Sequence, residues 1–212
     1  PKRFVLLSAI GLHYEEGYKD EVYKGEVPEY KRNEYYPAPN ALRLKWHKEW
    51  KEICGNIPSV IFEYRFYTDM YCDLAQMQVV RETHRDMKGL ENVSFQGCMN
   101  DQTHRMYMPT SLPLILMGET LFDKNLDFES FTNDYFEGAF GEDGAACREY
   151  LEELSRLLCP SNFRIGGGNG VETAGIGDAE SAKKCWLCNP YVAECAKKIP
   201  GHVDAFMPTV MK

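Results

Sequence analysis

The segment 59–71, SVIFEYRFYTDMY, alternates aromatic and polar side chains and therefore predicts a β-strand with two different faces. The two faces are Phe62, Tyr64 and Phe66 on one side, and Glu63, Arg65 and Tyr67 on the other. Helical segments flank this strand, and strands in such units are normally apolar on both faces. The polar face therefore indicates a barrel interior or a cleft in which polar groups act on a ligand.

Two further segments predict β-strands, and a helix follows each of the three strands. We expect the strands at 4–12, 59–71 and 93–98, and the helices at 41–54, 74–88 and 110–122. Asn40 and Asp73 are good N-cap residues for the first two helices. Three successive strand and helix units predict parallel strands joined by right-handed crossovers, that is, an α/β fold.

From about position 125 onward the apolar spacing is helical and predicts no further strand. Phe128, Phe131 and Tyr135 form one apolar stripe, and a second stripe follows in 149–158. A glycine-rich segment at 161–177 is typical of a surface loop. We therefore divide the chain into a βα region, 1–124, and a helical extension with a Gly-rich loop, 125–212.

The amino-acid composition argues against some classes of partner and favours one cellular compartment. The formal net charge of -8 over 212 residues disfavours nucleic-acid and membrane-surface partners, because both require basic patches. No apolar run approaches the roughly 20 residues of a membrane span. The eight cysteines lie within apolar helical and strand patterns, which favours a reduced, cytoplasmic setting. The first residue is Pro1 and not Met, which is compatible with a processed or excised chain.

The run RETHRDMKGLENVSFQGC, followed by MPTSLPLILMGETLFDKNLDFESFTNDYFEGAFGEDGAACREYLEEL, resembles the late part of bacterial glycoside-hydrolase-like (β/α)8 barrel proteins related to alpha-glucuronidases. A domain of unknown function in that group has the same layout. The matching positions are Phe95 and Gly97 in the last strand, 112–122 in its helix, 135–141 in an acidic aromatic helix, and Tyr150 and Leu151 beyond it.

The resemblance covers roughly residues 4–160 and implies the C-terminal βα units of a (β/α)8-type barrel followed by a helical extension. It also implies a carbohydrate ligand. Three βα units cannot close an eight-stranded barrel. The remainder of the barrel would then belong to a longer parent chain. If the three units fold alone, we expect a small open α/β sheet instead.

A glycosidase requires two carboxyl groups flanking the sugar bond, and barrel enzymes carry them at the carboxyl ends of strands. The candidate acids are Glu63, Asp69 and Asp101. The candidate ligand contacts are Arg65, Tyr67, Gln96, His104 and His13, with the tyrosines of the loop 13–40. The planar guanidinium of Arg65 could bind the carboxylate of a uronic acid.

Each candidate also has a plainer interpretation. Glu63 and Arg65 can form an internal ion pair, and Asp69 can be an exposed loop residue. His13 and His104 can be loop or packing residues, and we expect His84 to be a hydrogen-bonded core histidine.

The cysteines of the tail do not make a convincing metal site. Cys185, Cys188 and Cys195, with His202, begin like a zinc site, but the spacing of a fourth ligand matches no strong pattern. The run GGGNG follows no strand, which argues against a phosphate-binding loop. We therefore expect neither a metal nor another cofactor.

The sequence thus predicts a carbohydrate-active domain that hydrolyses a glycosidic bond with paired carboxylates. The alternative is a non-catalytic carbohydrate-binding or interaction domain, in which the same strand ends bind a ligand without cleaving it. A third alternative is a structural fragment in which Arg65 seals Glu63 and no cavity adjoins them.

Overall fold

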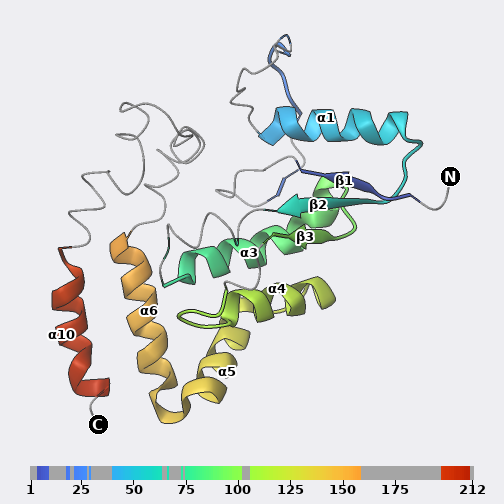
Figure 1. Cartoon of the computed structure of the whole chain (residues 1–212). Helices are drawn as coiled ribbons and strands as arrows, with labels where there is room; N and C mark the ends of the chain where they lie inside the picture. Colours follow the sequence, from blue (N-terminus) through green and yellow to red (C-terminus); the bar gives the residue numbers. More distant parts are fainter. Residues whose placement is uncertain are drawn as a thin grey trace.

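The computed structural model describes residues 4–9, 18–19, 22–27, 29, 40–63, 66, 73, 75–101, 106–158 and 197–210 (Figure 1). Within these ranges the fold is mixed α/β. Three strands, β1 (Leu6–Ser8), β2 (Ser59–Glu63) and β3 (Cys98–Asn100), form a parallel sheet in the order β1-β2-β3. These strands make an open sheet and not a closed barrel, which is the arrangement expected of three βα units that fold alone.

Helices account for most of the other described residues. They are α1 (Asn40–Ile53), α3 (Met77–Gly89), α4 (Leu112–Phe122), α5 (Phe128–Phe140), α6 (Gly144–Leu158) and α10 (Ile199–Val210), with short 3-10 turns at Leu90–Val93 and Gly141–Asp143. Helices α3 to α6 gather below the strands in the view of Figure 1, and α10 lies beside α6. The three helices predicted in the βα region are therefore present, with bounds that differ by a few residues.

The strands are shorter than the alternation of side chains predicts. β2 ends at Glu63, and Phe66 is already helical. The segment predicted as a strand from 93 instead begins as a 3-10 turn that ends at Ser94, whose φ of 65° is left-handed. The N–H groups of Ser94 and Phe95 donate back to Glu91 and Leu90, so they are not available to a β-ladder.

Helices α1 and α3 cover the same face of the sheet. Ser8 pairs with Ile61, and Ile61 pairs with Cys98, so these side chains share a face. His47 of α1 lies 2.8 Å from the Ser8 hydroxyl, and the Met87 sulfur of α3 lies 3.6 Å from the Cys98 sulfur. Right-handed crossovers between sequential parallel strands produce this one-sided arrangement.

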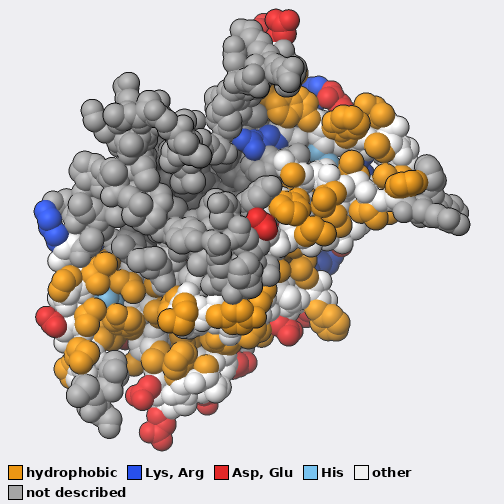
Figure 2. Space-filling model, in the orientation of Figure 1, with side chains coloured by type: hydrophobic (Ala, Val, Ile, Leu, Met, Phe, Trp, Pro, Cys, Tyr) orange, Lys and Arg blue, Asp and Glu red, His pale blue; other side chains and the backbone are white. Residues whose placement is uncertain are grey.

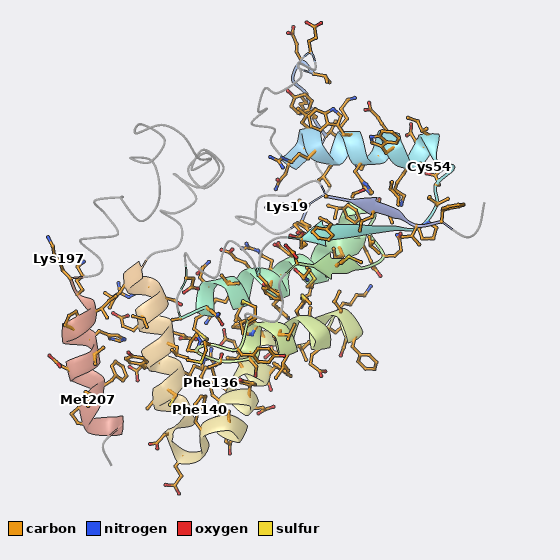
Figure 3. All side chains as sticks on the ribbon, viewed as in Figure 1. Lys19, Cys54, Phe136, Phe140, Lys197 and Met207 are labelled. Atoms are coloured by element: carbon orange, nitrogen blue, oxygen red, sulfur yellow. The ribbon has the colours of Figure 1, made fainter. Side chains whose placement is uncertain are left out.

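Two large hydrophobic clusters meet along α3, and a smaller third cluster comprises Phe66, Val79 and Met106. The first lies between the sheet and its covering helices and comprises Tyr18, Leu44, Ile61, Met87, Leu90, Val93 and Phe95. The second lies among α3, α4, α5 and α6 and comprises Ala75, Met77, Val80, Leu112, Leu116, Phe136 and Leu151. The Phe136 ring of the second cluster stacks on the exposed Phe140 ring of the same helix, with centroids 5.7 Å apart (Figure 3). Because α3 contributes to both large clusters, it connects the sheet to the helical layer.

Candidate functional site

The structure describes only part of the predicted site. Glu63, Gln96 and Asp101 lie among the described residues. Asp69, Arg65, Tyr67, His104 and His13 lie outside them. The ion pair between Glu63 and Arg65 and the tyrosine-rich loop therefore stay predictions.

Glu63 and Asp101 meet at the carboxyl edge of the sheet, where β2 and β3 both end. Glu63 is the last residue of β2 and pairs with Asn100, the last residue of β3. The backbone N–H of Asp101 donates to the carbonyl oxygen of Glu63 over 2.9 Å. Two acidic residues, distant in sequence, are thus joined through their backbones at adjacent strand ends.

The Glu63 side chain lies on the face of the sheet that the helices cover. It shares that face with Ser59 and Ile61, and only 1% of Glu63 is exposed. In a (β/α)8 barrel the helices cover the outer face, and the opposite face lines the interior. Glu63 is therefore on the other face from the one its alternation led us to expect. A period of two specifies which side chains share a face but not which face receives the helices.

Asn100 extends this polar edge toward α4. Its side-chain N–H group lies 2.8 Å from the Met117 sulfur of α4 and 3.3 Å from the Cys98 sulfur. Asn100 and Asp101 are both half-buried. Asp101 is therefore the described acid of the predicted site that is open to an incoming molecule.

Helix α3 adds two buried carboxylates that the sequence analysis did not single out, Glu82 and Asp86. The Gln78 amide donates to Glu82 over 2.8 Å. The signal was present in the sequence, because acids spaced four apart occupy one helix face. That face adjoins the apolar stripe of α3, and only packing shows that it is buried.

Helix α3 begins three residues later than predicted, with Gln76 and not Asp73 at the N-cap position, but the Asp73 side chain still accepts N–H groups of its first turn and adds a tertiary contact. The Asp73 carboxylate accepts the backbone N–H groups of Gln76 (2.9 Å), Gln78 (2.8 Å) and Val79 (3.2 Å). It also accepts the hydroxyl of Ser155 on α6 over 2.6 Å. Burial raises the pKa of Asp73, while these hydrogen bonds oppose the rise. This arrangement fastens α3 to α6 and is structural.

Gln76, at the N-cap position of α3, adopts a left-handed conformation with φ of 64°. Its amide nitrogen donates to the carbonyl oxygen of Met108 over 2.6 Å, whereas its Oε1 atom has no hydrogen-bond partner within the described part of the chain. A non-glycine residue in this backbone region is uncommon and is held there by its surroundings. Gln76 thus connects α3 to the segment that precedes α4.

Gln96 lies at the opposite, amino edge of the sheet. Its side-chain oxygen accepts the N–H of Ser59, the first residue of β2, over 2.8 Å. Its backbone N–H donates to the Ser59 carbonyl oxygen over 2.9 Å. The structure therefore does not bring Gln96 together with Glu63 and Asp101. The Gln96 side chain instead hydrogen-bonds to the backbone at the start of β2.

The described histidines have structural partners. His84 lies 3.0 Å from the carbonyl oxygen of Leu126 and beside Phe128, which confirms it as a hydrogen-bonded core residue. His202 of α10 lies 3.0 Å from the carbonyl oxygen of Tyr150 and stacks on the Tyr150 ring. His202 thus contacts Tyr150, while Cys185, Cys188 and Cys195, the other residues considered for a zinc site, lie outside the described residues.

Among the described residues, no group of three or more His, Cys, Asp or Glu side chains is placed to hold a metal ion. No helix in the described ranges is long and apolar enough to cross a membrane.

Comparisons with known proteins leave the function to be inferred from this chain alone. A scan against protein-family models, a search of curated proteins and a search of solved structures each gave no match.

Proposed function

We propose that this chain is a carbohydrate-active domain that holds a polyhydroxylated ligand at the carboxyl edge of its parallel sheet. Ligands of open α/β sheets bind beyond the carboxyl ends of the strands. The observation that carries the proposal is the junction of Asp101 and Glu63, in which the Asp101 N–H donates to the Glu63 carbonyl oxygen at 2.9 Å. A ligand at this edge would lie beside the Asp101 carboxylate, which supports the proposal.

The chemistry of this edge suits hydroxyl groups. An ionised carboxylate accepts hydrogen bonds from hydroxyls, and an amide both donates and accepts them. Asp101 is half-buried, so its carboxylate could reach a ligand, whereas the Asn100 Oδ1 atom is buried and its Nδ2 atom contacts the Met117 and Cys98 sulfurs. Glu63 is almost fully buried beneath them and would support the edge from the helix side.

Binding is favoured over hydrolysis by the exposure of the two acids. A glycosidase requires two carboxyl groups that face one pocket at a separation of roughly 5 to 10 Å. Glu63 faces the helices and is 1% exposed, whereas Asp101 is half-buried at the rim. The described residues therefore support the non-catalytic carbohydrate-binding alternative better than the paired-carboxylate mechanism.

Glycoside hydrolysis is the second candidate. Neighbouring strands lie about 4.8 Å apart, so acids at adjacent strand ends start close to the separation that retaining enzymes use. Glu63 and Asp101 hold such positions. Within this candidate, Asp69 remains a third predicted acid.

The first test measures saccharide binding by ligand-observed NMR on a panel of neutral and uronic sugars, with wild-type protein, Asp101→Asn and Asp134→Asn. Asp134 is an exposed acid on α5, so the control makes the same chemical change away from the sheet. We expect Asp101→Asn to weaken binding at least tenfold and Asp134→Asn to leave it unchanged. Absence of binding to every sugar, or equal loss in both variants, would overturn the proposal.

The same panel, offered as aryl glycosides and aryl uronides, separates the two candidates. Turnover that is lost in both Asp101→Asn and Glu63→Gln, at unchanged thermal stability, would support hydrolysis. Binding without turnover would support the binding domain. Turnover that survives both substitutions would exclude these two residues as the catalytic pair.

A further inference from the structure

Three sulfur-bearing side chains from three different elements converge where the sheet meets its helices. The Cys98 thiol of β3 lies 3.6 Å from the Met87 sulfur of α3. The Asn100 amide nitrogen lies 3.3 Å from the Cys98 sulfur and 2.8 Å from the Met117 sulfur of α4. Cys98 and Met117 both pack against the hydrophobic cluster that contains Met87. We call Met87, Cys98 and Met117 the sulfur cluster.

The Asn100 amide distinguishes the sulfur cluster from ordinary core packing. The sulfur of a thiol or a thioether is a weak acceptor, so it compensates poorly for the water that an amide N–H group loses. The Asn100 Oδ1 atom is also buried, with no hydrogen-bond partner within the described part of the chain. A thiolate at Cys98 would be a charged acceptor, and hydrogen bonds to charged groups are the stronger ones. The amide nitrogen is therefore placed where it would stabilise an ionised sulfur.

We propose that the sulfur cluster binds one Cu(I) ion, with the Cys98 thiolate and the Met87 and Met117 thioethers as its ligands. Soft thiolate and thioether ligands select Cu(I), whereas hard cations take oxygen ligands. Sulfur atoms that share one ion at bonds of about 2.3 Å lie roughly 4 Å apart. The Cys98 and Met87 sulfurs, at 3.6 Å, are close to that spacing. Methionine is flexible, so Met117 can turn from Asn100 toward the ion.

The charge and surroundings of the sulfur cluster suit this ion. Cys98 loses its proton on binding, so one thiolate and one Cu(I) form a neutral complex and one proton passes to solvent. A neutral complex suits a site packed against an apolar cluster, because burial penalises net charge. Figure 2 shows hydrophobic side chains gathered over the strands, and apolar surroundings limit solvent access to a metal. Met87 is 4% exposed, whereas Cys98 and Met117 are partly exposed and give the ion a route.

This proposal departs from the sequence-based expectation that the chain holds no metal. The three ligands come from one strand and two helices, and they meet only because these elements dock. No local spacing of cysteine or histidine therefore indicates the site. The proposal does not depend on the proposed carbohydrate function.

Carbon-13 NMR of the methionine methyl groups tests the proposal, because it observes two of the ligands directly. Cu(I), which is diamagnetic, is added without oxygen up to one equivalent per cysteine, so that other cysteines do not withhold it. The variants are Cys98→Ser and Met117→Leu, and the matched controls are Cys54→Ser and Met207→Leu. Cys54 directly follows α1, and Met207 lies on α10, so neither control belongs to the sulfur cluster. Circular dichroism verifies that every variant is folded.

We expect Cu(I) to shift the Met87 and Met117 methyl signals in the wild type and in both controls. Cys98→Ser should abolish both shifts. Met117→Leu should keep the Met87 shift but weaken binding at least tenfold in competition with bathocuproine disulfonate. Unmoved Met87 and Met117 signals in the wild type, or equal shifts in Cys98→Ser, would overturn the proposal. Loss of the shifts in Cys54→Ser would place the ion elsewhere and also overturn it.

Discussion

At the scale of single residues, His47 shows how a polar side chain can be held inside a small core. It is 1% exposed, its Nδ1 atom lies 2.8 Å from the Ser8 hydroxyl, and its ring stacks on Phe95 with centroids 4.1 Å apart. Burial, and then the positive charge of Lys51, lower the pKa of His47 from 6.5 to about 4. The ring is therefore neutral in the folded protein at physiological pH.

This shift predicts that acid destabilises the fold. Between pH 6.5 and about 4 the unfolded chain binds a proton at His47 that the folded chain does not, so the free energy of unfolding falls as pH falls. The loss is at most about 3 kcal/mol, taking 1.36 kcal/mol for each pKa unit. Urea unfolding at a series of pH values measures it. His47→Gln should show a shallower dependence, although lowering of the His84 pKa contributes in the same direction. An unchanged slope would contradict the assignment.

At the scale of elements, the start of α3 depends on a residue of α6. Asp73 accepts three backbone N–H groups of α3 and its preceding turn, and Ser155 donates to Asp73 while accepting the N–H of Met77 over 3.0 Å. By contrast, Asp127 caps α5 through a single exposed bond to the Ser130 N–H. The two caps have similar sequence signals but different environments.

We therefore expect Asp73→Ala to cost more than Asp127→Ala. The first leaves several buried donors without an acceptor, at a cost of roughly 2–4 kcal/mol in the free energy of unfolding. The second removes an exposed cap worth about 1 kcal/mol. Chemical denaturation of both variants under the same conditions measures the difference. Equal costs would show that burial of Asp73 adds nothing to its capping role.

At the scale of the whole molecule, α3 forms part of both large hydrophobic clusters and should make folding cooperative. Met87 of α3 belongs to the cluster beneath the sheet, whereas Met77 and Val80 of the same helix belong to the cluster among the helices. A structural change in one cluster therefore reaches the other through a single helix.

Phe136→Ala tests this coupling, because Phe136 is fully buried on α5, in the cluster that does not contact the sheet. Removal of a buried aromatic ring costs about 3–5 kcal/mol. We expect the substitution to lower one common transition seen by far-UV circular dichroism and by tryptophan fluorescence, to which Trp46 and Trp50 of α1 contribute. Two separate transitions, with the fluorescence signal unmoved, would mean that the clusters unfold independently.

Local signals in the sequence determined which elements form and where several of them begin. Asn40 is the first residue of α1, Asp73 accepts N–H groups of the first turn of α3 from three residues before its N-cap, and the alternation of strand and helix predicted parallel βα units. These features depend on hydrogen bonds and spacing within a few residues, so they can be read without knowledge of the fold. The lengths of the strands were overestimated, because the turn at Ser94 and the helical residue Phe66 interrupt an otherwise suitable pattern.

Only the tertiary structure decided which face each polar side chain occupies. Alternation placed Glu63 opposite Phe62, but the crossovers through α1 and α3 determined that Glu63 is covered and Phe62 lies on the opposite face. The contact of His47 with Ser8 spans 39 residues, and that of Asp73 with Ser155 spans 82. Such contacts depend on how distant elements dock, and a local pattern carries no information about that docking.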